Sequence, residues 1–302
     1  MISIVVPVYN ESENLDELNK RLNDIMKINS LSYEIIYVND GSTDNSKNIL
    51  SELSRKNKNI NYINFFRNFG QHAAVIAGFK KATGDYVVTL DADLQNPPEE
   101  IPRLILEIKQ GYDMVCGVRK NRKDSFLRKF LSKIMNKIIS RLVKNNLSDY
   151  GCMLRVYKIS LVKIIAKYGE KSVYIPSLAA WLTSNIKEVD VEHNHRLRGK
   201  SKYNLFTLFN QAFDLITSYT ILPLQIILVT GFFVFFSGLF LFSYLMFYRF
   251  VIGSPSSLTS FIAILILVSG MLMLSIGVVS EYLIRIHRES KKFPLYLIDD
   301  DD

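Results

Sequence analysis

The chain has 302 residues, which is enough for one large domain or two modest ones. It carries 37 Lys and Arg residues against 29 Asp and Glu residues, and the formal net charge of +8 favours an anionic partner. The two cysteines, Cys116 and Cys152, lie in apolar or glycine-flanked settings without C-x-x-C spacing, which excludes a disulfide framework and a cysteine metal site.

The first part of the chain alternates apolar runs with amphipathic segments. The opening run "MISIVVPVYN" has no basic n-region and no cleavage site, so we expect a strand and not a signal peptide. We predict strands at 2–6, 33–38, 61–66, 86–90 and 113–117, and helices at 13–28, 44–55, 70–82 and 99–109. This alternation predicts an α/β fold, with a mostly parallel sheet that helices cover on both faces.

Polar residues follow four of the predicted strands. These strand ends read "PVYNE" (7–11), "VNDGS" (38–42), "FFRNFG" (65–70) and "LDADLQ" (90–95). Ligands of such sheets bind beyond the carboxyl ends of the strands. We therefore expect the four segments to converge on one site.

Asp91 and Asp93 are the most informative residues of the fourth strand end, "VVTLDADLQNPPEEI" (87–101). In an extended chain, residues i and i+2 point to the same side, and two carboxylates held that close repel each other unless a cation lies between them. A polar turn after a strand is the alternative, but the convergence of strand ends favours a cation. Such oxygen ligands suit Mg²⁺ or Mn²⁺ bound together with the phosphates of a substrate.

Ten basic residues and one acidic residue lie between positions 119 and 144. Apolar residues recur there at helical spacing, which predicts a basic amphipathic helix over 119–145. One interpretation packs this helix on the core with a solvated basic face. The other, favoured by the apolar segments further along the chain, places it at the anionic cytoplasmic leaflet of a membrane. Because the charge lies beside membrane segments without interleaved exposed aromatic residues, we expect no nucleic-acid partner.

The last third of the chain predicts a membrane hairpin. No charged residue occurs from 215 to 248 or from 250 to 280, and each stretch exceeds the about 20 apolar residues that span a bilayer core. We predict a cytoplasmic domain at 1–200, an interfacial helix at 201–220, two transmembrane helices (221–248 and 258–280) within 221–284, and a tail at 285–302 whose acidic end, 299–302, is disordered. Basic residues flank the hairpin and Arg249 alone lies in its loop, so both termini are expected in the cytoplasm.

The motifs "PVYNE", "NDGSTD" and "LDADLQNPPEEIP" resemble those of the inverting family 2 glycosyltransferases, which have a nucleotide-binding GT-A fold. The two predicted spans and "RGKSKY" (198–203) narrow the resemblance to the polyprenyl-phosphate glycosyltransferases. The stretches 67–79, 91–104, 111–125 and 149–157 are similar to members that transfer 4-deoxy-4-formamido-L-arabinose to undecaprenyl phosphate. Trp181 in "LAAWLTS" is not in a Q-x-x-R-W motif, so the chain does not resemble the processive polysaccharide synthases.

The resemblance implies an enzyme of the bacterial inner membrane that moves a sugar from a UDP donor to undecaprenyl phosphate. The implied sugar is an amino- or formamido-arabinose for lipid A or envelope modification, while relatives with the same motifs transfer glucose, galactosamine or another hexose. Two other hypotheses are the same chemistry on another acceptor, such as a diacylglycerol or a protein, and a non-enzymatic nucleotide- or lipid-binding module. The intact motifs argue against the module. Homo-oligomerisation is left open.

The resemblance also implies roles for individual residues. Asp93 is the first choice of metal ligand, Asp91 is expected to contact ribose, metal or both, and Gln95 is expected to contact metal or phosphate. Asp40 binds the uracil or the ribose, and Tyr9 has simple packing as its alternative. The nucleotide-sugar set is Pro7, Tyr9, Glu11, Asp40, Asp91, Ala92, Gln95, Arg198 and Lys202, and the catalytic set is Asp93, Asp149, Arg119 and Arg128.

A phosphate monoester acceptor has a second pKa near ~6 and is largely dianionic at neutral pH, so little general-base help is needed. The protein must position the phosphate and neutralise charge. The cations expected around the donor and acceptor phosphates are Arg119, Arg128, Arg198 and Lys202. Asp149 is interpreted as a base or orienting residue, with a helix cap or turn as the alternative. The histidines match no zinc spacing and are expected to pack as polar residues, with the donor pocket as an alternative for the first: His72, His193 and His195.

Overall fold

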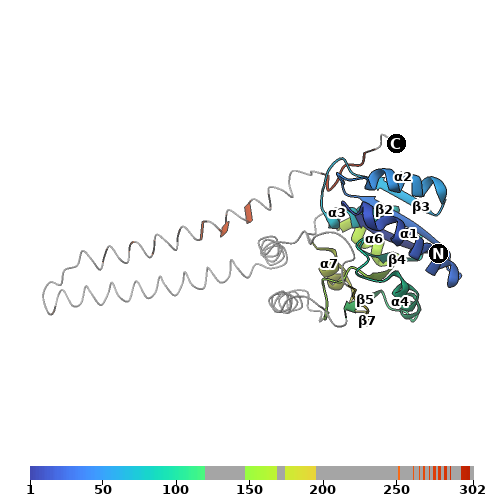
Figure 1. Cartoon of the computed structure of the whole chain (residues 1–302). Coiled ribbons are helices and arrows are strands. Elements are labelled where there is room, and N and C mark those ends of the chain that lie inside the picture. Colours follow the sequence, from blue (N-terminus) through green and yellow to red (C-terminus); the bar gives the residue numbers. More distant parts are fainter. Residues whose placement is uncertain are drawn as a thin grey trace. The chain divides into compact units, whose positions relative to one another are not determined.

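The computed structural model describes residues 1–119, 147–168, 174–194 and 294–299, together with isolated helical positions between 251 and 286 (Figure 1). The chain divides into two units, Met1–Leu215 with Pro294–Asp302, and Ile216–Phe293. The predicted helix over 119–145 beyond its first residue, the helix at 201–220 and the span at 221–248 lie outside the described residues. The same holds for His195 and for the cations Arg128, Arg198 and Lys202.

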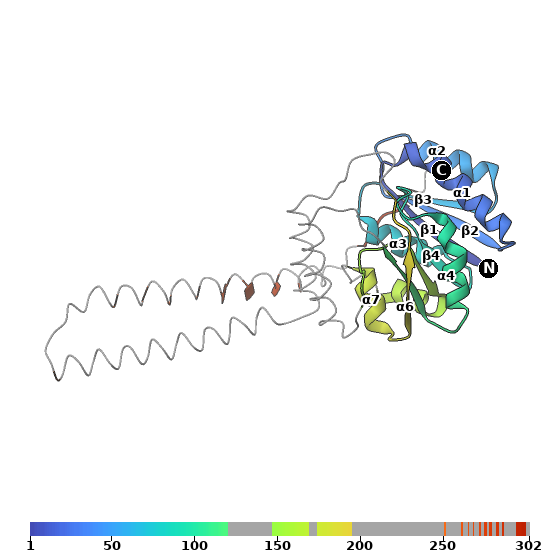
Figure 2. The same cartoon turned by 60° about the horizontal axis from the view of Figure 1, so that its bottom comes forward.

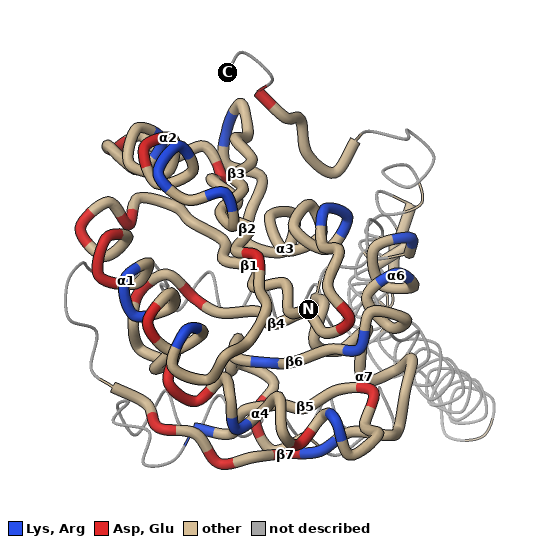
Figure 3. The backbone as a smooth tube through the Cα atoms, turned by 90° about the vertical axis from the view of Figure 1, so that its right-hand side faces the viewer, with Lys and Arg blue, Asp and Glu red and all other residues tan. Residues whose placement is uncertain are grey.

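The first unit contains a seven-stranded sheet in the order β3-β2-β1-β4-β6-β5-β7, which can be followed from top to bottom in Figure 3. Its strands are β1 Ile2–Val8, β2 Tyr33–Asn39, β3 Ile60–Asn64, β4 Tyr86–Thr89, β5 Met114–Arg119, β6 Arg155–Lys158 and β7 Ile186–Val191. β6 is antiparallel to its neighbours β4 and β5, and the remaining pairings are parallel. The carboxyl ends of the parallel strands therefore share one edge.

Helices cover both faces of this sheet (Figures 1 and 2). The helices of one face are α1 Ser12–Ile28, α2 Ser46–Lys56, the 3₁₀ turn η1 Pro98–Glu100 and α4 Ile101–Ile108. Those of the other face are α3 Gln71–Lys81, α6 Ile159–Tyr168 and α7 Ile175–Leu182. Because both faces are covered, β1 is buried at every position and is apolar apart from Ser3.

The main core lies between the sheet and α1. Leu15, Leu18, Leu22 and Met26 recur three or four residues apart, so they form one face of α1, and all four are fully buried. They pack in one cluster with the even-numbered residues of β1. This packing fixes the central strands, whose ends carry the predicted site.

The predicted strands and helices of the first 117 residues are confirmed, with small shifts at their ends. The strand predicted at 61–66 ends at Asn64, because the residues from 65 to 70 form a loop over the strand end. Cys116 and Cys152 are free and buried, as expected, and burial raises the pKa of their thiols to about 11 and about 12. No prediction covers β6, β7, α6 or α7.

The second unit is described only at isolated helical positions. Within the described residues, no helix combines the length and the apolar character that crossing a membrane requires. The predicted span at 258–280 is represented by a few of its positions. The transmembrane hairpin therefore stays a prediction.

Candidate active site

The carboxyl ends of β3, β2, β1 and β4 meet along one edge of the sheet. Val8 pairs with Asn39 and Asn39 with Asn64, so three of these strands end side by side. β4 ends slightly earlier, with Thr89 opposite Val5. The four polar segments that follow these strands are thus brought to one edge, as expected from the sequence.

Asp93 lies in a turn that Asp91 immediately precedes, and neither residue is part of a strand. β4 ends at Thr89, and the turn begins at Ala92, so the extended geometry expected for the two carboxylates is wrong. Ala92 and Leu94 are buried in the core, whereas Asp91 and Asp93 are only partly buried. Leu94 adopts a φ of 59°, which an L-residue rarely adopts. Core packing of Ala92 and Leu94, and not a pleat, therefore holds both carboxylates at the edge.

Neighbouring groups orient both carboxylates. Gln71, the first residue of α3, donates its side-chain Nε2–H to Asp91 Oδ1 at 2.6 Å. The Gln95 backbone N–H donates to Asp93 Oδ1 at 3.1 Å, and the Gln95 carbonyl accepts from the Asn194 N–H at 2.8 Å. In the described part of the chain, no three or more His, Cys, Asp or Glu side chains cluster as a metal site. A cation bound by Asp91 and Asp93 would need further oxygen ligands besides these two carboxylates.

Asp40 joins the end of β2 to the loop after β3. The residue is buried, and its Oδ1 accepts the Phe69 N–H at 2.7 Å while its Oδ2 accepts the Gly70 N–H at 3.0 Å. Burial raises the pKa of the Asp40 carboxyl, and the two N–H donors oppose that shift. The following Gly41 has a φ of 64°, and a Cβ there would lie 2.2 Å from the Arg67 carbonyl carbon. The loop can approach Asp40 this closely because residue 41 has no side chain.

The "PVYNE" and "NDGSTD" segments hold each other through side chain–backbone hydrogen bonds. The Asn10 N–H donates to Ser42 Oγ at 2.9 Å, and the Thr43 N–H donates to Asn10 Oδ1 at 2.7 Å. Glu11 accepts the Asn14 side-chain amide at 2.7 Å. Pro7 is buried, and Tyr9 and Glu11 are partly buried beside it in sequence. The two segments that carry the predicted nucleotide-sugar residues are therefore held together by hydrogen bonds.

Arg119 and Asp149 form a buried, bidentate ion pair. Arg119 Nε donates to Asp149 Oδ2 at 2.7 Å and its Nη2 donates to Asp149 Oδ1 at 2.8 Å. Only 13% of the Arg119 side chain and 5% of the Asp149 side chain are exposed. The Gly151 N–H also donates to Asp149, at 3.0 Å, and a Cβ at Gly151 would lie 2.9 Å from Arg119 Nη2. Asp149 thus orients Arg119. The sequence predicts both residues as site residues but does not predict that they pair with each other.

Arg155, which sequence reasoning missed, supports the turn that contains Asp149. It is fully buried at the start of β6, and it donates to the carbonyls of Asp149, Tyr150 and Cys152 at 3.1, 2.7 and 2.8 Å. The Tyr174 hydroxyl donates to the same Tyr150 carbonyl. An Arg inside a strand pattern usually indicates an exposed position, so the sequence carried no signal for this role.

His72 packs inside the protein, as expected for a polar packing residue. Its ring meets the Tyr174 ring edge to face at 5.2 Å between centroids. Burial, aided by the positive charge of Arg155, lowers the pKa of His72 to about 4. The imidazole is therefore neutral at physiological pH.

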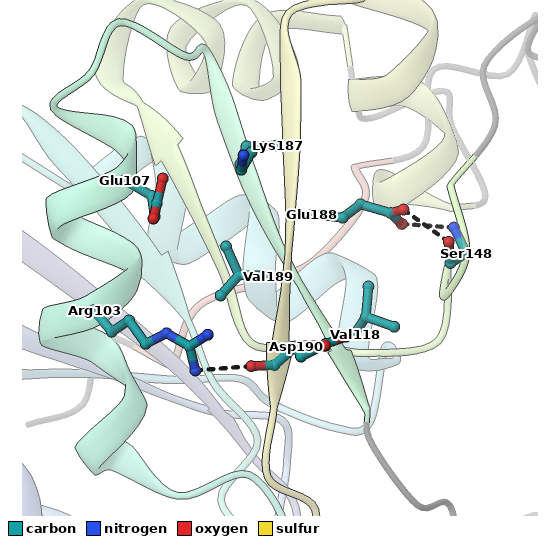
Figure 4. A pocket seen from close by; sticks show the side chains of 8 residues that line it. All are labelled: Arg103, Glu107, Val118, Ser148, Lys187, Glu188, Val189 and Asp190. Atoms are coloured by element: carbon teal, nitrogen blue, oxygen red, sulfur yellow. Dashed lines mark hydrogen bonds between the residues drawn. The ribbon is translucent and has the colours of Figure 1, made fainter.

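A separate pocket of about 340 Å³ lies among α4, β5 and β7 (Figure 4). Its wall includes Ser148, whose N–H and Oγ–H donate to the Glu188 carboxylate at 2.6 and 2.8 Å. Arg103 donates from Nη1 to the Asp190 carbonyl at 3.0 Å. None of the predicted site residues in the described part of the chain lines this pocket. The Ser148–Glu188 contact nevertheless anchors the chain immediately before Asp149.

The mixed sheet with helices on both faces is a GT-A-like fold. The likeness extends to glucosyl-3-phosphoglycerate synthase from Mycobacterium tuberculosis, crystallised with Mn²⁺, UDP and phosphoglyceric acid, with a TM-score of 0.51 and 16% identity over 72% of this chain and 76% of that chain. Mannosyl-3-phosphoglycerate synthase from Rubrobacter xylanophilus has a TM-score of 0.50 and 14% identity over 72% of each chain. At such identities the likeness establishes the fold.

The chain belongs to the family described as "Glycosyl transferase family 2", whose model matches residues 3–165, and it is a glycosyltransferase. It is 40% identical over 301 residues to an undecaprenyl-phosphate 4-deoxy-4-formamido-L-arabinose transferase of Serratia proteamaculans. The matched residues make up 98% of this chain and 92% of that relative. The protein of the same name from Proteus mirabilis is 39% identical with the same coverage. The family resemblance identified from the motifs is confirmed.

Proposed function

We propose that the enzyme transfers a 4-deoxy-4-formamido-L-arabinose-type sugar from a UDP donor to undecaprenyl phosphate. The observation that carries the proposal is the Asp91–Asp93 turn at the same sheet edge as Asp40, in a chain 40% identical over nearly its whole length to transferases named for this reaction. Two phosphates of a donor supply the oxygen ligands that the two carboxylates lack for a complete cation site.

The nucleoside is assigned to the Asp40 side of the edge. Asp40 Oδ1 accepts the Phe69 N–H and, at 3.3 Å, the Gly70 N–H, whereas Oδ2 accepts the Gly70 N–H alone and retains acceptor capacity for a uracil N–H or a ribose hydroxyl. The interlocked loops around Asn10 and Thr43 give this region a fixed backbone, which reduces the ordering cost of binding. Pro7, Tyr9 and Glu11 complete the proposed pocket.

Asp91 and Asp93 are proposed to hold Mg²⁺ or Mn²⁺ together with the donor diphosphate, and Gln95 is a further contact. The residues fit such an ion, because hard divalent cations take one or two carboxylates plus substrate phosphates. When bound, the cation would neutralise charge on the departing diphosphate. Gln71 keeps Asp91 in orientation through its 2.6 Å hydrogen bond. The neighbouring fold, crystallised with Mn²⁺ and UDP, supports this assignment.

The proposed reaction is a displacement at the anomeric carbon. An oxygen of the acceptor phosphate forms the new bond to that carbon, and the bond to the UDP oxygen breaks, so UDP departs with the electron pair. No general base is required, because the acceptor is already largely dianionic at neutral pH. Arg119, whose Nε and Nη2 donate to Asp149, is proposed to stabilise phosphate charge through its remaining guanidinium N–H groups. Arg128, Arg198 and Lys202 are proposed to do the same.

The lipid acceptor implies a membrane location, which we propose as the bacterial inner membrane with both termini in the cytoplasm. Large apolar side chains at described helical positions of the second unit support it, since all are 40–64% exposed: Val251, Phe261, Leu265, Val268, Leu272, Ile276, Val279, Leu283 and Ile286. Reporter fusions after residue 302 and within 249–257 test the topology. A loop reporter that is active only in the cytoplasm would contradict it.

The proposed function is tested by incubating the purified full-length protein in detergent with undecaprenyl phosphate and a panel of UDP-sugars. We expect mass spectrometry to detect a lipid-linked formamido-arabinose, formed faster than a product from UDP-glucose or UDP-N-acetylgalactosamine. Preference for one of those hexoses would reassign the sugar. Transfer only to a diacylglycerol would reassign the acceptor.

A further inference from the structure

The segment Pro294–Asp299 lies beside the end of β3 and the residues that follow it, and forms an isolated β-bridge there. Ile298 forms an antiparallel bridge with Phe65. The Phe66 N–H donates to the Leu297 carbonyl at 3.2 Å, and the Asp299 N–H donates to the Asn64 carbonyl at 2.8 Å. Figure 1 shows this segment, in red, near α2 and β3. The disorder predicted from residue 299 onward is therefore wrong for Asp299.

Side chains from both neighbouring helices also hold the 294–299 segment. Lys47 of α2 donates from Nζ to Asp299 Oδ2 at 3.0 Å. Lys80 of α3 places its Nζ 5.5 Å from the centre of the Tyr296 ring, within the range of a cation–π contact. These contacts are specific to side chains, so the segment is held by more than backbone pairing.

An aromatic path leads from the 294–299 segment to the proposed nucleoside pocket. Tyr296 stacks on Phe65, with ring centroids 4.8 Å apart and planes 13° apart. Phe65 in turn meets the Phe69 ring edge to face at 5.7 Å. The Phe69 N–H is the one that donates to Asp40 Oδ1 at 2.7 Å. Tyr296 thus supports the loop that orients the Asp40 carboxylate.

A polar path runs in parallel through side-chain amides. The Asn64 residue that pairs with Asp299 accepts the Asn39 Nδ2–H at its own Oδ1, at 3.0 Å, and both asparagines are buried. Asn39 Oδ1 accepts the Ser42 N–H at 3.2 Å. Asn39 and Ser42 flank Asp40 and Gly41 in the chain. Both paths therefore end at the same short segment.

We infer that the 294–299 segment is a positioning element of the donor site: by stacking Tyr296 on Phe65 and anchoring Asp299, it fixes the 65–70 loop and thereby the Asp40 carboxylate for the nucleoside of the donor. The inference rests on the proposed function, because it takes Asp40 as the nucleoside contact. It adds to that function a part of the chain far from the family motifs. The segment acts on donor affinity and not on the acceptor.

The test measures UDP binding by calorimetry, with Mg²⁺ or Mn²⁺ present, on the full-length protein in detergent. Tyr296→Ala is expected to raise the Kd of UDP about tenfold, within the range usual for coupling between sites. Tyr296→Phe keeps the stack and should bind UDP within about twofold of the wild type. Leu297→Ala is the matched control, because the Leu297 side chain is exposed while its backbone pairing remains. It too should bind like the wild type.

Two further readouts separate positioning from general stability. Hydrogen exchange at the Phe69 and Gly70 amides should quicken in Tyr296→Ala, and the KM for undecaprenyl phosphate should stay within about twofold of the wild-type value. Should Tyr296→Ala fail to fold, Asp299→Asn, which removes the charge that pairs with Lys47, should raise the Kd of UDP in the same direction.

The outcomes distinguish this inference from the proposed function. A wild-type protein that binds no UDP overturns the proposed function and the inference with it. A wild-type protein that binds UDP, with a folded Tyr296→Ala variant of unchanged Kd, overturns the inference alone. So does a Tyr296→Ala variant that melts at a lower temperature but retains both the UDP affinity and the amide protection.

Discussion

Replacing Asp149 with Asn should destabilise the protein much more than replacing Glu99 with Gln, although both acids form bidentate pairs with Arg. Arg21 donates to Glu99 at 2.8 and 2.6 Å, and Arg119 donates to Asp149 at 2.7 and 2.8 Å. The geometries are alike, but the exposures differ. Side-chain exposure is 24% and 48% for Arg21 and Glu99, against 13% and 5% for Arg119 and Asp149. Burial is thus the main difference between the two pairs, and Asp149 also accepts the Gly151 N–H.

The two costs follow from that burial. Removing one partner of a buried pair leaves an uncompensated charge and costs about 3–5 kcal/mol. An exposed pair contributes about 0–1 kcal/mol, because water already screens its charges. At about 2–4 °C per kcal/mol, Asp149→Asn should lower Tm by at least roughly 6 °C, and Glu99→Gln by at most about 4 °C.

Thermal unfolding of the full-length protein, followed by intrinsic fluorescence in one detergent, measures both variants. A double variant, Arg119→Met with Asp149→Asn, should recover part of the loss, because it removes the unpaired charge. Equal Tm shifts for the two single variants would refute the reasoning, as would a double variant less stable than Asp149→Asn alone.

Two more predictions concern His72 and Gln71. Burial lowers the pKa of His72 to about 4, so between pH 6.5 and 4 the folded protein binds fewer protons than the unfolded chain. The contribution of neutral His72 to the free energy of unfolding is therefore complete above pH 6.5 and is lost as the pH falls toward 4. The loss is on the order of 3 kcal/mol, and His72→Phe should flatten the pH dependence of Tm; an unchanged slope would contradict this. Gln71→Ala removes the hydrogen bond to Asp91 and should lower kcat/KM for the donor about tenfold or more without changing Tm, whereas unaltered kinetics would show that Asp91 needs no such orientation.

The sequence pattern alone was sufficient to predict the central strands of the sheet and the helices between them. β1 and β2 are largely apolar, apart from Ser3, Glu34 and Asn39, because helices cover both faces of the sheet, and α1 has a regular apolar face. β6 and β7 escaped prediction for physical reasons. β6 has four residues and a buried charge, Arg155, and β7 is an edge strand whose Lys187, Glu188 and Asp190 break the apolar pattern.

The residue types of the candidate site were predictable, but their geometry was not. Asp91 and Asp93 were found from the strand-end pattern, yet the core packing of Ala92 and Leu94 makes the segment a turn. The Arg119–Asp149 pair joins positions 30 residues apart. The Tyr296–Phe65 stack joins residues that are far apart in the sequence. Such contacts depend on tertiary packing, which local patterns do not encode.

The central claim is that the edge around Asp91 and Asp93 transfers sugar to a lipid phosphate with a divalent cation. Formation of the lipid-linked sugar by the wild type and by Asp93→Asn, each with and without EDTA, tests it most directly. The account predicts full product for the wild type in Mg²⁺ or Mn²⁺, none in excess EDTA with recovery on adding metal, and none for a folded Asp93→Asn protein under any condition. Undiminished transfer by the wild type in excess EDTA, or by folded Asp93→Asn, would contradict it.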